Sequence, residues 1–212
     1  MKESAPPPRI DGMGVDPPGR NVTDYAACDE RLLIEAVRGD ASLYGHVVTR
    51  FERVLARYVK RVLGRHAEAA EDVLQEVFIK AYVNINDYDR ARPFAPWLFR
   101  IAHNEAVSFL RKRKAEPQLV NGEDAGLILE NMMAEGDPAL HFEQGRTAAE
   151  VRGALKGLEP RYREVLMLRY LEDKSYDEIA EILQMPPGTV ATLIRRGLRR
   201  LQQPLKATWG AV

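Results

Sequence analysis

The sequence predicts an all-α protein: two small helical domains joined by a flexible acidic linker, with a helix-turn-helix in the C-terminal domain. Apolar residues recur at helical spacing in both halves of the chain, and no segment shows the period-two alternation of a strand. Between the halves, residues 115–144 carry seven acidic side chains and no lysine or arginine. Because the whole chain has no net charge, the remainder is basic, and this segregation is more informative than the average.

Composition and helix breakers set the domain boundaries. Residues 1–28 are rich in proline and glycine, and we expect them to form a disordered tail. Residues 29–114 form the first helical domain and residues 115–144 the linker. Residues 145–206 form the helix-turn-helix domain, and residues 207–212 a short tail. Each domain is large enough to bury a small core.

Four helices are predicted in the first domain. Apolar residues at helical spacing predict helices over 29–37, 41–63, 67–83 and 93–114, and a polar loop is predicted over 84–92. Gly39 and Asp40 separate the first two helices, Gly64 ends the second, and Pro93 opens the fourth. Trp97 lies among apolar neighbours on the fourth helix, so core packing is favoured over contact with a base.

The helix-turn-helix prediction depends on residues 175–201. Ser175 followed three residues later by Glu178 is a capping-box pattern and predicts the start of the first helix. Pro186 and Pro187 stop that helix and suit the first turn of the next. Such a pair of helices can insert the second helix into a DNA groove. An ordinary pair of surface helices with a charged face is the alternative.

Other classes of function are disfavoured by what the chain contains. Cys28 is the only cysteine, and the four histidines are scattered, so we expect no metal site and no cofactor. We find no phosphate-binding loop and no nucleophile paired with a base, which argues against an enzyme. No apolar run approaches the ~20 residues that cross a bilayer, so we expect a cytoplasmic protein without membrane insertion.

Two local patterns resemble a known family. The first is E-D-x-x-Q-E-x-F from Glu71 to Phe78, and the second is F-x-x-W-L-x-R-I-A-x-N from Phe94 to Asn104. Both are similar to region 2 of the extracytoplasmic-function (ECF) sigma factors of bacterial RNA polymerase, and residues 155–190 are similar to region 4 of the same family. The resemblance implies a protein that binds core RNA polymerase and directs promoter recognition and melting.

The resemblance also implies three binding surfaces. The helix that would dock on the coiled coil of the polymerase β′ subunit presents Asp72, Gln75, Glu76 and Lys80. The loop and helix that would hold the melted −10 element present Tyr88, Arg90, Arg92, Arg100, His103, Asn104, Ser108 and Arg111. Aromatic rings and guanidinium planes can stack on unpaired bases, and cationic side chains can bind phosphates. The helix that would contact the −35 element presents Thr189, Thr192, Arg195, Arg196 and Arg199.

One departure from the family concerns the second helix of the helix-turn-helix. Where relatives carry basic residues after Gly-Thr-Val, this chain has Ala191, Thr192 and Leu193, so we expect weaker −35 contacts. Gln184 also stands where the family often has glycine, and we expect it to accept a left-handed backbone.

The expected partners are the β′ and β subunits of core polymerase, promoter DNA and, as a further option, an anti-sigma factor. Two alternatives remain at this point. The chain could be a helix-turn-helix regulator that binds duplex DNA without polymerase, or an adaptor that docks on polymerase only. The acidic linker could lie in a nucleic-acid channel or act as a solvated spacer.

Overall fold

The computed structural model describes residues 29–113, 128, 131, 153–155 and 157–207. Helices are the only regular elements in this described part, in agreement with the predicted all-α class. The predicted N-terminal tail (1–28), residues 208–212 of the predicted C-terminal tail and nearly all of the predicted linker lie outside the described residues, and Ala207 belongs to the last helix.

The N-terminal half consists of α-helices connected by short 3-10 turns. Asp29 is the N-cap of the first helix, and its side chain accepts a hydrogen bond from the Arg31 amide at 2.8 Å. Gly64 ends the second α-helix with a φ of 55°, which favours glycine. The elements are α2 (Glu30–Gly39), η1 (Ala41–Leu43), α3 (Tyr44–Leu63), η2 (Gly64–Ala69), α4 (Ala70–Val83), η3 (Ile85–Asp87) and α5 (Phe94–Lys112).

Two helices begin later than their apolar patterns predicted. Residues 41–43 form the 3-10 turn η1, because the side chain of Asp40 caps the Ser42 amide and starts a separate turn. Residues 64–69 form the turn η2, in which His66 has φ −103° and ψ 22°. This non-helical residue lets the chain reverse direction between α3 and α4.

The core of this half lies between α3, α4 and α5. Phe51 of α3 packs against Phe94 of α5, with ring centroids 5.6 Å apart. Trp97 is buried, and its ring lies 5.3 Å from Phe94 and 5.5 Å from Tyr88. The predicted core position of Trp97 is therefore confirmed.

The C-terminal half contains the predicted pair of helices. Its elements are α8 (Pro160–Tyr170), α9 (Tyr176–Leu183) and α10 (Pro187–Ala207). The capping box is present: the Glu178 amide donates to Ser175 Oγ at 3.2 Å, and the Ser175 amide donates to the Glu178 carboxylate at 2.8 Å. Gln184 follows α9 in the expected left-handed conformation, with φ 52° and ψ 47°.

Gly197 marks a close approach between α10 and α8. A Cβ atom at this position would lie 3.3 Å from Tyr162 Cβ and 3.3 Å from Leu166 Cδ1. Most real Cβ atoms keep a greater distance, so a larger residue at this position would require Tyr162 and Leu166 to shift.

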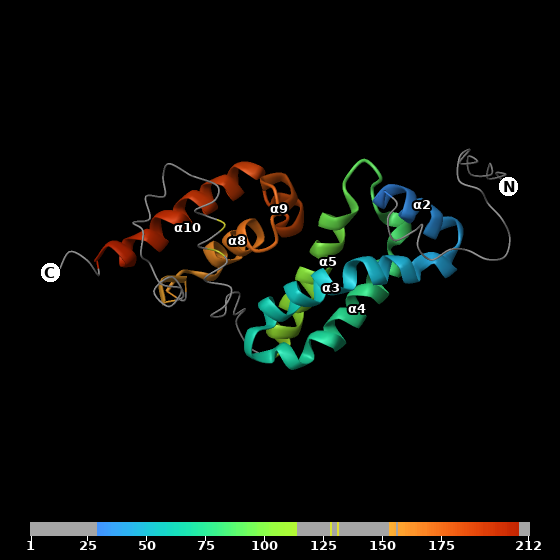
Figure 1. Cartoon of the computed structure of the whole chain (residues 1–212), viewed down its shortest axis with the longest axis horizontal. Coiled ribbons are helices and arrows are strands. Elements are labelled where there is room, and N and C mark those ends of the chain that lie inside the picture. The colour runs from blue at the N-terminus through green and yellow to red at the C-terminus, as the bar shows by residue number, and fades with distance from the viewer. Residues whose placement is uncertain (1–28, 114–127, 129–130, 132–152, 156, 208–212) are drawn as a thin grey trace.

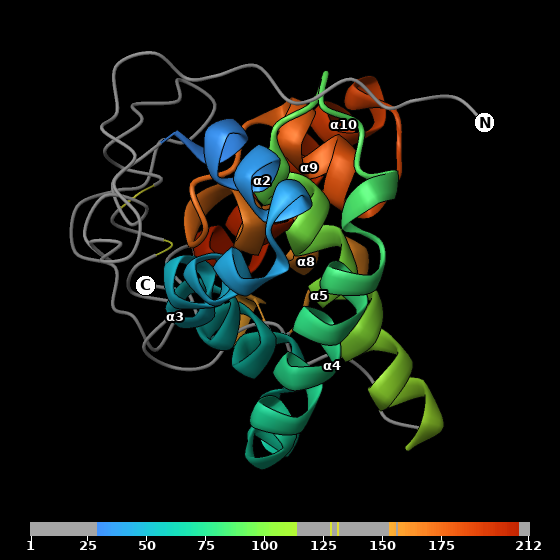
Figure 2. The ribbon, with the colours of Figure 1, turned by 90° about the vertical axis from the view of Figure 1, so that its right-hand side faces the viewer.

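The two halves meet where α5 lies beside α9 (Figures 1 and 2). Arg92 and Arg100 of the N-terminal half form ion pairs with Glu181 of α9. Arg61 of α3 forms a further ion pair with Glu172, whose side chain is fully buried. Acidic side chains of the C-terminal half thus meet basic side chains of the N-terminal half.

Two described residues lie within the predicted linker. The Ile128 side chain is completely buried, and the side-chain Nδ2 of Asn131 donates a hydrogen bond to the Tyr170 carbonyl of α8. At these two positions the segment is attached to the folded protein, so it is more than a solvated spacer there.

Candidate functional site

The expected polymerase-docking residues all lie on the solvent side of α4. Asp72, Gln75, Glu76 and Lys80 are exposed, because α4 turns Val73, Leu74, Val77 and Phe78 toward the core. On that side they border different neighbours. Gln75 borders α3, whereas Asp72 and Glu76 line a small hollow of about 130 Å³ against α5. Lys80 is held there by Glu105 of α5, with 2.6 Å between Nζ and Oε1.

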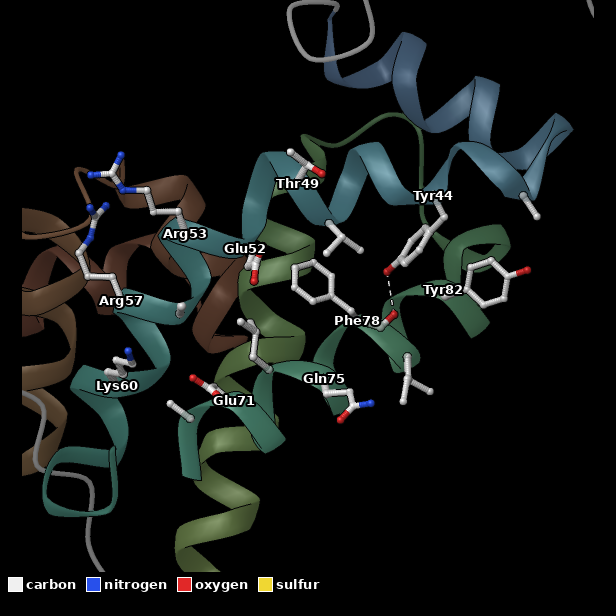
Figure 3. Close-up of a pocket in the computed structure, with 16 residues that line it drawn as sticks. Tyr44, Thr49, Glu52, Arg53, Arg57, Lys60, Glu71, Gln75, Phe78 and Tyr82 are labelled. Atoms are coloured by element: carbon white, nitrogen blue, oxygen red, sulfur yellow. Dashed lines mark hydrogen bonds between the residues drawn. The ribbon is translucent and has the colours of Figure 1, made fainter. Parts of the chain in front are cut away.

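A larger groove runs between α3 and α4, with a volume of about 1270 Å³ (Figure 3). One end is aromatic and apolar, with Tyr44, Phe78 and Tyr82, and the other end is basic, with Arg53 and Arg57 on α3. The Tyr44 hydroxyl donates to the Phe78 carbonyl at 2.7 Å, so it joins the two helices at the apolar end. Burial raises the pKa of Tyr44, which keeps this donor protonated.

Three apolar side chains at the end of α4 are exposed, although their exposure was not predicted from the sequence. Ile79 is 48% exposed, Tyr82 44% and Val83 69%. Ile79 and Tyr82 line the groove, and Val83 follows Tyr82 on the last turn of α4. The signal was present in the sequence, since α4 has apolar residues on more than one side. An exposed apolar cluster of this kind is typical of a surface that another protein covers.

The loop before α5 corrects one predicted contact. Tyr88 was expected to offer its ring for stacking on a base, but it is only 4% exposed. Its ring packs against Phe94 and Trp97, and its hydroxyl donates to the Arg92 carbonyl. The aromatic residue therefore belongs to the core, and apart from Ala91 the side chains that residues 84–92 leave exposed are polar. Arg90 is among them and pairs with Glu35 of α2 at 3.0 Å.

The expected −10 residues on α5 fall into two groups. Asn104 and Arg111 are exposed and Ser108 is half-buried, so this group remains accessible. Arg100 and His103 instead face the C-terminal half. The Arg100 guanidinium contacts Glu181 at 2.5 Å, the same carboxylate that binds Arg92 from the loop.

His103 is enclosed between the two halves. Its Nδ1 shares a hydrogen bond with the Tyr58 hydroxyl at 3.0 Å, and its Nε2 lies 3.2 Å from Glu164 of α8. Burial lowers the pKa of His103 to about 4 and raises the pKa of Glu164 to about 7. Near pH 6, the His103 imidazole and the Glu164 carboxyl group are therefore both neutral, and the imidazole accepts a hydrogen bond from the carboxyl group.

The expected −35 residues lie along the start and middle of α10. Thr189, Arg195, Arg196 and Arg199 are exposed, and Thr192 is half-buried. The Thr192 hydroxyl donates to the Gly188 carbonyl at 2.8 Å, which leaves its oxygen as an acceptor. The helix is oriented by Val190, Ile194 and Leu198, which are buried on its opposite side.

Two family models match the chain in order. The Sigma-70 region 2 model matches residues 47–116, and the Sigma-70 region 4 model matches residues 148–201. The ECF RNA polymerase sigma factor SigW of Bacillus subtilis is 35% identical over 184 residues, which cover 84% of this chain and 96% of that protein. The chain belongs to the ECF sigma factor family.

Other relatives of this sigma factor agree with that assignment. The RNA polymerase sigma-H factor of Pseudomonas aeruginosa is 31% identical, with 84% of this chain and 94% of that protein covered. The solved structure of CnrH in complex with the cytosolic domain of CnrY has a TM-score of 0.57 and 26% identity, and covers 84% of this chain and 97% of that one. The fold of this sigma factor is thus a known one.

Two negative observations apply to the part of the sigma factor that the structure describes. No three His, Cys, Asp or Glu side chains there come together as a candidate metal site. None of the helices in that part has the length and apolar character needed to cross a membrane.

Proposed function

We propose that this sigma factor acts by holding three partners on three surfaces: core polymerase on α4, the melted −10 strand on α5, and the −35 duplex on α10. The observation that carries the proposal is the presence of both sigma regions, in order, on one chain. Sigma factors direct transcription initiation by core RNA polymerase and have no catalytic activity of their own. Membership of this family supports the proposal that the chain is a non-enzymatic regulator.

The docking surface for core polymerase combines charge with apolar contact. The exposed carboxylates Asp72 and Glu76 offer negative charge to a basic partner. Ile79, Tyr82 and Val83 offer the apolar area whose burial supplies most of the free energy of association. A helical element of the polymerase β′ subunit lying along α4 would cover both sets, and the groove between α3 and α4 would take its bulkier side chains.

The −10 surface extends from the loop to the accessible side of α5. Arg90 and Arg111 supply positive charge for phosphates. Asn104 and Ser108 supply donors and acceptors for base edges. Because Tyr88 is buried, stacking of an unpaired base would depend on a guanidinium plane rather than on an aromatic ring.

The −35 surface is carried by exposed arginines and two threonines of α10. Arg195, Arg196 and Arg199 suit phosphates or guanine edges, and Thr189 suits either base edges or the backbone. We include an anti-sigma factor among the partners, because the similar solved structure of RpoE from Bartonella quintana is a complex with the anti-sigma factor NepR (25% identity, TM-score 0.53, 77% of this chain and 96% of that one).

Transcription with purified core polymerase on genomic DNA fragments tests this function. We expect defined start sites when the sigma factor is present and none with core alone. Asn104→Ala should reduce transcription through the −10 element, and Arg65→Ala, which is exposed in η2 outside the three proposed surfaces, serves as the control. Tight sequence-specific binding of duplex DNA by the free chain, with no transcription after core is added, would favour the alternative of a conventional regulator.

A further inference from the structure

Arg38 makes an unusual set of contacts for a residue of α2. It lies in the last turn of that helix, and its side chain is only 10% exposed. Its Nη2 donates to the Ile85, Asn86 and Tyr88 carbonyls at 2.7, 3.2 and 2.8 Å, and its Nε also donates to the Ile85 carbonyl at 3.0 Å. One guanidinium group thus binds three main-chain carbonyls of the loop that precedes α5.

A second ion pair links α2 to the same loop. Glu35 contacts Arg38 with one carboxylate oxygen, at 3.5 Å, and Arg90 with the other, at 3.0 Å. The Arg38 guanidinium also lies 5.8 Å from the Tyr88 ring centroid. These contacts hold the backbone of the loop against α2. The side chains of Asn86, Asp89 and Arg90 stay exposed to solvent.

We infer that Arg38 is a positioning residue for the −10 strand: it gives the loop the shape that presents the polar side chains to an unpaired base. A lysine cannot replace it fully, because a single ammonium cannot reproduce the paired donation from Nε and Nη2 to the Ile85 carbonyl. Arg38 lies outside the matched region 2 model, which begins at residue 47, so its role follows from its contacts. The inference rests on the proposed −10 function of the loop.

Arg38→Ala and Arg38→Lys test the role, with Arg65→Ala, at an exposed position of η2, as a matched control. Hydrogen exchange should rise in residues 84–92 of Arg38→Ala and stay unchanged in α3 and α4. Affinity for core polymerase should be unchanged, and open-complex formation at a promoter should fall at least tenfold. Arg38→Lys should fall between Arg38→Ala and the parent, and if Arg38→Ala fails to fold, Arg38→Lys carries the test alone.

Two outcomes separate this inference from the proposed function. If Arg38→Ala and Arg38→Lys form open complexes like the parent while Asn104→Ala does not, the positioning role is wrong and the −10 surface stands. If neither the Arg38 nor the Asn104 variants lose activity, the −10 surface itself is wrong, and the positioning role falls with it.

Discussion

The exposed apolar end of α4 allows a quantitative prediction for polymerase docking. Full burial of an aliphatic side chain contributes about 1.5–3 kcal/mol. Ile79 is 48% exposed and Val83 69% exposed, so roughly half to two-thirds of that contribution is still available to a partner. Ile79→Ala combined with Val83→Ala should therefore weaken core binding by about 2 kcal/mol, which corresponds to about a 30-fold higher Kd.

The assay is a titration of fluorescently labelled sigma factor with core polymerase at a fixed salt concentration. Leu32→Ala is the matched control, because Leu32 is 42% exposed but lies on α2, outside the groove. Its Kd should equal that of the parent. The thermal midpoint of the double variant should stay close to that of the parent, since both residues already contact solvent in the free chain. An unchanged Kd for the double variant would refute the apolar docking surface.

Three further predictions follow from other parts of the molecule. Asp72→Lys combined with Glu76→Lys should lower core affinity at low salt and leave the thermal midpoint unchanged, because both side chains are exposed; full retention of core in a pull-down would contradict this. Arg195→Ala should lower −35-dependent transcription without lowering core affinity, as measured by run-off transcription on promoters with and without that element. The contact between α5 and α8 should weaken as pH rises from 4.5 through 7, where Glu164 must lose its proton, and also as pH falls from 6.5 through 4, where His103 must gain one. In thermal denaturation as a function of pH, Glu164→Gln should remove the alkaline decline and keep the acidic one.

The local signals in the sequence predicted most of the helices correctly. The capping box at Ser175 and Glu178 and the left-handed Gln184 depend on neighbouring residues only, so they could be identified without the fold. The motifs that resemble the family predicted the order of the two sigma regions along the chain. Helix starts near Ala41 and Ala67 were predicted too early, because an apolar pattern does not distinguish a 3-10 turn from the helix that follows.

The errors at the candidate site concern contacts between distant residues. Tyr88 lies in a stretch that is polar on average, and nothing local reveals that α5 supplies Phe94 and Trp97 to bury its ring. Arg38 is separated from its carbonyl partners by about fifty residues, so its role needs the tertiary structure. The pairing of Arg92 and Arg100 with Glu181 also joins segments that no local pattern connects.

The close packing at Gly197 has a mechanical consequence. With no side chain between them, α8 and α10 are in direct contact at Tyr162 and Leu166, and well-packed interiors transmit displacement with little loss. Glu164 lies on the same helix as both of those residues and holds His103 of the other half. When that contact breaks, α8 should carry α10 with it as one rigid body. The α10 arginines that we propose for the −35 contact would then change position together.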